Sequence, residues 1–388
     1  MIGLPIRAMT LAELKSRFER SRLPVQPPRV GELRVGLTMP SWTIYRSTDR
    51  STIYDRFTQL GQRFPLRFFE PRNRSFLLRS NADYIVRRIA AKARVALPDP
   101  CLTPPVDYAS ELDVIYSSGL YPSTDLHTPV LWEQTFAPQL NVDGPAWIRC
   151  LRKAWTIAAE RATRVVTPTP VSAEWFADIF PAQRDKIDVV PFFLPDVTAI
   201  CAASMEAKLQ STGPVRVIFV GKEARRKGLD VLARAFASLP SAIQSQLRVQ
   251  VVSRMLDGPV ELPVGWEHIA YAPDVHALMR QADVLAFPTK VEAYGLVLVE
   301  GLAAGCAVLT TKAPLQRSIV GDDAGYFVDP NDHATVALAL SHVVEDRAKL
   351  ASRIRAARAR FESRYEATIV GRDYHRLLWA TSGKTPPP

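Results

Sequence analysis

The chain has 388 residues, of which 47% are hydrophobic and 23% charged, and its formal net charge is +10. A chain of this length can build two packed domains, and no low-complexity block exceeds the last three prolines. We therefore exclude the disordered and fibrous classes of protein and expect a soluble globular one. The sequence contains no uncharged apolar run of about twenty residues, so we expect no transmembrane helix.

The start of the chain and its cysteines favour a cytoplasmic protein. Residues 1–7 lack the apolar core and the cleavage site of a signal peptide. The cysteines are scattered without C-x-x-C spacing, so we expect free thiols in a reducing compartment. They are Cys101, Cys150, Cys201 and Cys306.

Strand-like and helical stretches alternate along the first half, after a helical and Pro-rich leader at residues 1–30. We expect strands at 33–38, 66–69, 113–116, 130–132, 164–168 and 187–191. We expect helices at about 50–63, 80–93, 146–162 and 171–180. This alternation predicts a parallel sheet with crossover helices.

The second half restarts after Pro195 with a helix and repeats the alternation. We expect strands at 215–220, 248–252, 268–271, 284–287 and 307–310. A long helix at about 333–362 and a helical segment at 374–379 follow. Ligands of doubly wound sheets bind at the carboxyl ends of the strands, which here predicts a site in a cleft between the halves.

Two carboxylates eight positions apart, Glu292 and Glu300, mark the most informative stretch of the chain. The apolar run 282–288 predicts a buried strand and the run 296–304 a buried helix, so Glu292 lies in the turn. The start of that helix offers free backbone N–H groups and the positive end of a dipole, which suit a phosphate. Glu300 lies about one to two turns deeper. The two acids can therefore grip polyhydroxylated groups at opposite ends of one molecule, and a sugar nucleotide fits this arrangement.

A cationic loop, Lys222 to Gly228, follows the first strand of the second half. Gly221 closes that strand, four basic side chains follow, and a helical pattern begins at Leu229. A strand, a glycine turn and a cationic loop that opens a helix make an anion site on physical grounds. A solvated charge run is the alternative, because such loops are often simply exposed.

The stretch Glu292–Glu300 resembles the E-x7-E motif of retaining GT-B glycosyltransferases, in particular glycosyltransferase family 4 (glycosyl transferases group 1). Phe-Pro-Thr at 287–289 and Ala-Gly-Cys-Ala-Val at 304–308 agree with the family, and residues 325–332 are similar to its G-x-L-V-x-P-x-D stretch. The resemblance covers residues 214–375 strongly and the first half in outline. It implies an α/β fold of the GT-B type, with two Rossmann-like doubly wound parallel-sheet domains facing across a cleft.

The resemblance also implies a division of labour. Residues 1–195 are implied to bind the acceptor and residues 196–371 the nucleotide-sugar donor, with a final helix at about 372–385 packing back on the first domain. The implied activity is retaining transfer of a sugar from a nucleotide-diphosphate sugar to a glycan or lipid-linked acceptor. The breadth of the family favours bacterial surface polysaccharide or glycolipid biosynthesis. No cofactor is implied beyond the donor itself.

Individual roles follow from the matching positions. Lys222 and Lys227 stand where the family places its two cations on the donor diphosphate. Because lysine replaces arginine at the first position, Arg225 or Arg226 is a candidate for the lost bidentate fork. Glu292 is implied to orient sugar hydroxyls. The candidate catalytic residues are thus Lys222, Lys227 and Glu292, and the candidate donor-binding residues are Gly221, Arg226, Tyr294, Gly295, Leu296 and Glu300.

Retaining transfer in this family is thought to let the leaving phosphate accept the proton of the acceptor hydroxyl, so it needs positioning and charge stabilisation rather than a dedicated base. No D-x-D motif and no His/Cys cluster occurs, and we expect no metal. The first half departs from the family: the loop at 38–42 has no glycine, and Glu133 and Gln134 stand where many members have a histidine. We interpret His127 as an ordinary surface residue.

Charge is concentrated in the first 94 residues, which hold 19 Lys and Arg against 7 Asp and Glu, so that the rest of the chain contributes −2 to the total of +10. The basic stretch at 63–94 is interleaved with aromatic residues, and the leader at 11–18 has amphipathic spacing. We interpret residues 1–94 as a surface for an anionic membrane or a lipid-phosphate acceptor, which places the protein in the cytoplasm or on the inner face of the cell membrane. The alternative is a soluble basic face that only raises the isoelectric point. No recognisable nucleic-acid module is present, so nucleic acid is not an expected partner.

Three alternatives stay open at this stage. Glu300 can serve only as a helix-capping or helix-pairing residue. The enzyme can be another GT-B nucleotide-sugar enzyme, an epimerase or a hydrolase. Last, the chain can be a catalytically silent relative that binds a membrane or partner through its basic face. The sequence does not name the sugar, the nucleotide or the acceptor; residues 254–257 and 273–275 are expected to frame the base by position alone.

Overall fold

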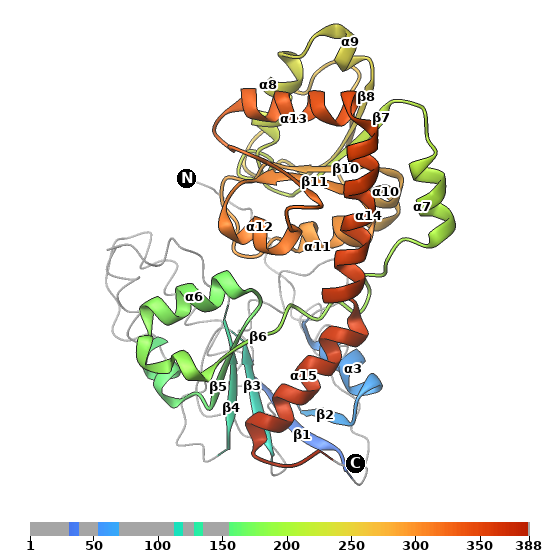
Figure 1. The fold of residues 1–388 in the computed structure, drawn as a ribbon. Helices are drawn as coiled ribbons and strands as arrows, with labels where there is room; N and C mark the ends of the chain where they lie inside the picture. The colour runs from blue at the N-terminus through green and yellow to red at the C-terminus, as the bar shows by residue number, and fades with distance from the viewer. Residues whose placement is uncertain (1–30, 39–52, 70–111, 119–127, 135–154, 387–388) are drawn as a thin grey trace, which may run out of the picture. The chain divides into compact units, whose positions relative to one another are not determined.

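The computed structural model describes residues 31–38, 53–69, 112–118, 128–134 and 155–386 (Figure 1). In this part of the chain no helix is both long enough and apolar enough to cross a membrane. Several predictions lie outside the described residues: the leader at 11–18, the loop at 39–42, the helix at 80–93, His127, and all of the basic stretch beyond residue 69.

The chain divides into two compact units. One holds residues up to Pro195 together with those from Val370 onward, and the other holds Asp196–Ile369. Each unit contains a six-stranded sheet in which the paired strands run parallel. Two doubly wound parallel sheets are the predicted architecture, and the prediction is confirmed.

The sheet of the first unit has the strand order β2-β1-β3-β4-β5-β6. Its strands are short and rich in β-branched and aromatic residues, and those inside the sheet are buried, whereas the edge strand at 187–189 is partly exposed. They are β1 (Leu33–Thr38), β2 (Leu66–Phe69), β3 (Val114–Ser118), β4 (Val130–Glu133), β5 (Arg164–Thr167) and β6 (Ile187–Val189).

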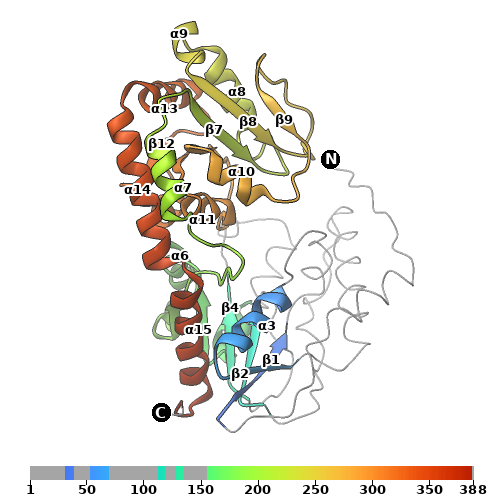
Figure 2. The same ribbon diagram turned by 90° about the vertical axis from the view of Figure 1, so that its right-hand side faces the viewer.

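Helices cover both faces of this first sheet. A helix at residues 155–161 and α6 (Pro170–Ile179) enclose the fully buried Trp132 of β4, whose ring meets Phe176 edge-on at 5.9 Å. Toward the other face, α3 (Ile53–Arg63) and α15 (Ala367–Ser382) both contact Tyr116 of β3 through aromatic rings. Figure 2 shows α15 beside α3, so the end of the chain completes the first unit. A six-residue 3-10 helix, η2 (Pro181–Lys186), connects α6 to β6.

The sheet of the second unit has the strand order β12-β11-β10-β7-β8-β9. The strands are β7 (Val215–Val220), β8 (Leu247–Val252), β9 (Glu267–Ile269), β10 (Val284–Phe287), β11 (Ala307–Thr311) and β12 (Gly325–Val328). Reading outward from β7, the chain first adds β8 and β9 on one side and then β10, β11 and β12 on the other. The direction of winding therefore reverses between β7 and β10.

Helices of the second unit form two layers. Figure 1 shows α8 (Leu229–Ala237) and α13 (His333–Glu345) side by side on one face, and α11 (Leu296–Ala303), α12 (Pro314–Val320) and α14 (Arg347–Arg364) on the other. One buried apolar cluster joins β7, β8 and β10 to α8 and α13. The remaining helices are α7 (Ala202–Leu209), α9 (Ser241–Gln244) and α10 (Val275–Gln281).

The prediction of one long helix at 333–362 is wrong. The helix breaks at Asp346, whose backbone has φ −116° and ψ 77°, and whose carboxylate accepts the Lys349 N–H at 2.8 Å as the cap of α14. Apolar periodicity continues on both sides of the break, so the pattern alone concealed it. The sequence reading also gave residues 325–328 only as a motif, whereas they form the edge strand β12.

In both units an arginine–aspartate clasp joins the amino ends of two neighbouring strands. In the first unit, Arg34 of β1 donates to Asp113 from its backbone N–H at 2.7 Å and from Nη2 at 2.8 Å. In the second, Arg216 of β7 donates to Asp283 in the same way, at 2.8 and 2.7 Å. Each clasp ties the first strand of its unit to the strand across the reversal, and so holds the opposite, carboxyl edge in register.

Candidate functional site

The predicted site residues of the second unit gather where the strand order reverses. The loop after β7 carries Gly221, Lys222 and Lys227, and the loop after β10 carries Glu292. These two strands are hydrogen-bonded neighbours, with Leu285 of β10 in register with Ile218 of β7. In open α/β sheets the crevice outside the carboxyl ends at such a reversal is the usual place for a ligand. The fold thus brings together two loops that are far apart in the sequence.

Glycine at position 221 allows the lysine stem to cross the end of β7. The Gly221 N–H donates to the Val252 carbonyl at 3.1 Å, and a Cβ at this position would lie 3.1 Å from Lys227 Cγ. Gly228 closes the loop in the left-handed conformation at φ +83°. A Cβ there would fall 2.0 Å from the Pro288 carbonyl oxygen, so only glycine lets the loops after β7 and β10 approach this closely.

Lys227 and Glu292 form an ion pair that joins the two loops. The lysine side chain is 11% exposed and the glutamate 13%, so water screens this pair far less than a surface pair. The ammonium also lies over the Phe287 ring, 5.1 Å from its centroid. Burial lowers the pKa of Lys227, while the Glu292 carboxylate acts in the opposite direction. The site therefore holds a cation ready for an anionic ligand, with Glu292 as its present partner.

The N-terminus of α11 stands directly after Glu292. Tyr294 is buried, and Gly295 caps the helix in the left-handed conformation at φ +88°. The cap provides no side-chain hydrogen bond to the first N–H groups of the helix, which begin at Leu296. A Cβ on Gly295 would lie 3.2 Å from Glu292 Cγ, so glycine also leaves room for the carboxylate. The predicted anion-binding helix end is in place beside the ion pair.

Two further predicted residues flank this centre. Glu300 lies on α11 four residues beyond Leu296, about 6 Å along the helix axis, and is half-buried. The backbone carbonyl of Lys222 accepts the Leu256 N–H at 2.9 Å, which ties the start of the cationic loop to the loop after β8. Within the described residues, no partner is found for the Lys222 ammonium.

The sequence reading missed how Asp257 supports the cationic loop. Its carboxylate accepts the backbone N–H groups of Arg225 at 3.2 Å and Arg226 at 2.7 Å. Position had suggested only that residues 254–257 frame a base. An acid after the neighbouring strand β8 is the available signal, since the carboxyl ends of adjacent parallel strands share one edge.

Both arginines of the cationic loop use their guanidinium groups in contacts within the protein. Arg225 Nη2 donates to the Pro259 carbonyl at 2.7 Å. The guanidinium of Arg226, a predicted donor-binding residue, pairs with Glu223 and donates to the Val291 carbonyl at 3.0 Å. The lysines, by contrast, reach either Glu292 or no partner among the described groups.

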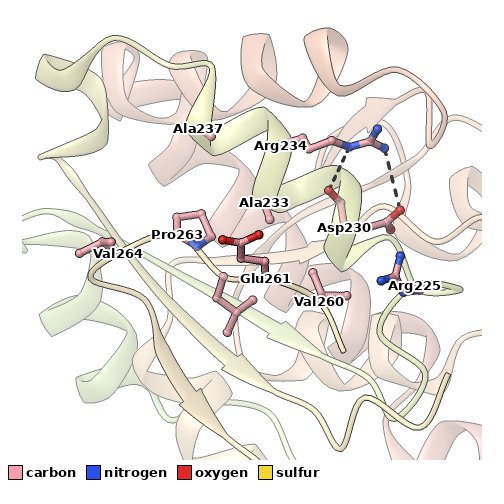
Figure 3. A pocket seen from close by; sticks show the side chains of 10 residues that line it. Arg225, Asp230, Ala233, Arg234, Ala237, Val260, Glu261, Pro263 and Val264 are labelled. Atoms are coloured by element: carbon pink, nitrogen blue, oxygen red, sulfur yellow. Dashed lines mark hydrogen bonds and ion pairs between the residues drawn. The ribbon is translucent and has the colours of Figure 1, made fainter. Parts of the chain in front are cut away.

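A pocket of about 560 Å³ lies elsewhere in the second unit, between α8 and residues 260–264 (Figure 3). Figure 3 shows Arg234 bonded to Asp230 at its edge and an apolar wall that includes Ala233 and Pro263. Of the residues considered for the donor, Arg225 lines this pocket, whereas Lys222, Arg226, Lys227 and Glu292 do not. Among the described residues, no group of three or more His, Cys, Asp or Glu side chains is placed to hold a metal ion.

In the first unit, Glu133 ends β4 at the carboxyl edge of the sheet and is buried. Its two carboxylate oxygens accept hydroxyl hydrogen bonds, from Ser118 at 2.8 Å and from Tyr374 of α15 at 2.9 Å. Burial raises the pKa of the neighbouring Tyr116 well above its usual value, and the Glu133 charge adds to that. Glu133 thus holds α15 against the sheet.

Most of the second unit matches the model of a known protein family. Residues 203–360 match the family model described as Glycosyl transferases group 1. The D-inositol 3-phosphate glycosyltransferase of Nocardia farcinica (strain IFM 10152) is 30% identical over 249 residues, which are 57% of this chain and 54% of that protein. The phosphatidyl-myo-inositol mannosyltransferase of Mycolicibacterium smegmatis (strain ATCC 700084 / mc(2)155) is 30% identical over 177 residues, 43% of this chain and 45% of that protein. The chain thus spans about half the length of these relatives.

Solved structures share the fold over most of the chain. Anabaena Alr3699/HepE, solved in complex with UDP, has a TM-score of 0.57 at 16% identity and covers 90% of this chain and 100% of its own. WaaG, described as a glycosyltransferase involved in lipopolysaccharide biosynthesis, has a TM-score of 0.58 at 16% identity, with 89% and 99% coverage. At such identities the likeness concerns the fold alone. The chain therefore has the GT-B fold, and its residues 203–360 are similar to the family described as Glycosyl transferases group 1.

Proposed function

We propose that this chain is a retaining glycosyltransferase that moves a sugar from a nucleotide-diphosphate sugar to a glycan or glycolipid acceptor. One observation carries the proposal: a poorly screened Lys227–Glu292 pair stands beside an uncapped helix N-terminus at the reversal of a doubly wound sheet. A cation and free N–H groups suit a diphosphate, and a carboxylate suits sugar hydroxyls. The complexes of Alr3699/HepE with UDP and with UDP-glucose support a donor of this class.

In the proposed reaction, the bond between the sugar's anomeric carbon and the diphosphate oxygen breaks, and the diphosphate leaves with the electron pair. Lys222, Lys227 and the first N–H groups of α11 stabilise the charge that develops on it. Glu292 orients the sugar hydroxyls, and Glu300 holds the ribose. The departing phosphate accepts the proton of the acceptor hydroxyl, which attacks the same face of the sugar. The catalytic contribution is therefore positioning and electrostatics, without a metal or a dedicated base.

The first unit is proposed to bind the acceptor. The names of two relatives specify D-inositol 3-phosphate and phosphatidyl-myo-inositol, which supports a phosphorylated or lipid-linked polyol acceptor here. Such an acceptor fits the excess of positive charge in residues 1–94. It also favours a place on the inner face of the cell membrane, which fractionation of cells into membrane and soluble extracts tests.

The test is a transfer assay with labelled UDP-, GDP- and ADP-sugars and a lipid and oligosaccharide extract as acceptor, with and without EDTA. We expect transfer from one donor, an anomeric configuration equal to that of the donor, and no loss with EDTA. Release of free sugar in preference to transfer would indicate a hydrolase, and isomerised nucleotide sugar an epimerase. An inverted product would refute the retaining mechanism.

A further inference from the structure

The two adjacent arginines of the cationic loop donate hydrogen bonds to two different loops. Arg225 turns toward the loop after β8, where it meets the Pro259 carbonyl. Arg226 turns toward the loop after β10, where it meets the Val291 carbonyl. Both acceptors are backbone oxygens of other loops. The guanidinium groups therefore brace the loops at the carboxyl edge of the sheet.

Glu223 fixes the direction of the Arg226 side chain. Its Nε donates to Glu223 Oε2 at 3.0 Å, and its Nη2 pairs with the same oxygen. This pairing fixes the plane of the guanidinium and leaves Nη1 for the Val291 carbonyl, at 3.0 Å. That carbonyl and the backbone nitrogen of Glu292 belong to the same peptide group. A hydrogen bond at this atom fixes where the Glu292 backbone starts.

The backbone of Arg226 strengthens the same connection. Its carbonyl accepts the Lys290 N–H at 3.0 Å. Thr289 Oγ1 donates to the Val291 carbonyl at 3.0 Å, so this oxygen receives two hydrogen bonds. Arg226 therefore holds two of the three peptide groups that link Thr289 to Glu292.

From these contacts we infer that Arg226, oriented by Glu223, is a positioning residue that presents Glu292 to the donor sugar and does not itself bind the diphosphate. The inference rests on the proposed function and refines it. It assigns the diphosphate to the two lysines and assigns the arginine to recognition of the sugar, through Glu292. A variant that lacks the arginine should lose preference for the sugar nucleotide over the free nucleoside diphosphate, and keep affinity for the latter.

The test uses the full chain with four substitutions: Arg226→Gln, Glu223→Gln, Lys227→Gln and, as a matched loss of one exposed arginine, Arg248→Gln on β8. Calorimetric titration with UDP, GDP and ADP, and with their glucose and mannose derivatives, gives each affinity. We expect Arg226→Gln and Glu223→Gln to bind the free diphosphate as the wild type does and to lose about tenfold in affinity for the sugar nucleotide, the scale of one charge-assisted hydrogen bond. We expect Lys227→Gln to lose about tenfold for both ligands and Arg248→Gln to lose neither. The inference is overturned if Arg226→Gln weakens the free diphosphate as much as Lys227→Gln does.

A measurement without ligand separates this inference from the proposed function. Hydrogen exchange of the wild type and Arg226→Gln compares the amides at 289–294, with the β11 amides as an internal control. Faster exchange confined to 289–294 supports the brace, and unchanged exchange contradicts it. If the wild type bound no nucleotide at all, the proposed function would fall, while exchange would still decide whether Arg226 holds this loop.

Discussion

Replacing Glu292 by glutamine should strengthen binding of the free nucleoside diphosphate while it strongly slows sugar transfer. In the structure the Glu292 carboxylate is paired with the Lys227 ammonium, so a diphosphate that binds the lysine must compete with this carboxylate. The carboxylate also repels the negative phosphates. Glutamine keeps the shape and one acceptor oxygen but removes the charge, and so removes both penalties.

The size of the gain follows from how exposed the pair is. Exposed pairs contribute up to about 1 kcal/mol, and breaking a fully buried pair costs about 3–5 kcal/mol. At 11% and 13% exposure the Lys227–Glu292 pair lies between these limits. We expect about 1–2 kcal/mol, which is about a 5- to 30-fold increase in affinity. The rate of transfer should fall about 10²–10³-fold, as when a group that stabilises a transition state is lost.

Titration calorimetry with UDP, GDP and ADP measures the affinity, and labelled-sugar transfer measures the rate. Glu267→Gln, which removes an exposed carboxylate hydrogen-bonded to Gln250, is the matched control and should change neither quantity. A weaker or unchanged affinity for the diphosphate in Glu292→Gln would refute the argument that the carboxylate competes for Lys227.

Three further predictions concern other parts of the chain. Gly228→Ala should destabilise the protein by more than about 2 kcal/mol, because the new Cβ adds a clash with the Pro288 carbonyl to the usual left-handed backbone penalty of about 1–2 kcal/mol. Gly265, at φ +87°, has no atom within 4 Å of the position of a Cβ, so Gly265→Ala should cost the backbone penalty alone. Equal losses of stability in urea unfolding would contradict this. Burial alone would raise the pKa of Asp113, but hydrogen bonds from Arg34 and Lys384 outweigh it and hold the pKa well below its usual 3.8. The stabilisation of the fold by the Asp113 carboxylate is therefore fully present above pH 3.8 and fades as the pH falls below it. The difference in stability between wild type and Asp113→Asn should be constant from about pH 5 to 7 and shrink below about pH 4. A difference that widened on acidification would be inconsistent with this clasp. Hydrogen bonds with Ser204 lower the pKa of the exposed Cys201, and burial raises the pKa of Cys306, so iodoacetamide should label Cys201 before Cys306 in the native protein. Equal labelling of these two cysteines by mass spectrometry would count against the described environments.

Most of the fold follows from local patterns in the sequence. Apolar runs closed by glycine or proline located strands such as β7 and β10, because fully buried parallel strands are continuously apolar. The pair of acids and the cationic loop located the carboxyl edge of the second sheet, since both follow such strands. The break at Asp346 was missed because a single capping side chain ends one helix and starts the next within an unbroken apolar period.

The contacts that support the site depend on which strands lie side by side in the sheet. Asp257 reaches the cationic loop only because β8 lies next to β7. Arg226 was predicted to bind the donor because lysine stands at position 222, where the family has an arginine. The structure turns it toward Glu223 and a backbone carbonyl. The contact with Glu223 spans three positions, but the contact with the Val291 carbonyl spans 65, which no local pattern encodes.

A crystal structure with the nucleoside diphosphate that binds best tests the central claim most directly. The account predicts phosphate oxygens within about 2.7–3.2 Å of Lys227 Nζ and of the Leu296 N–H, with Glu292 released from the lysine. A nucleotide bound in the pocket between α8 and residues 260–264, with the Lys227–Glu292 pair intact, would contradict it.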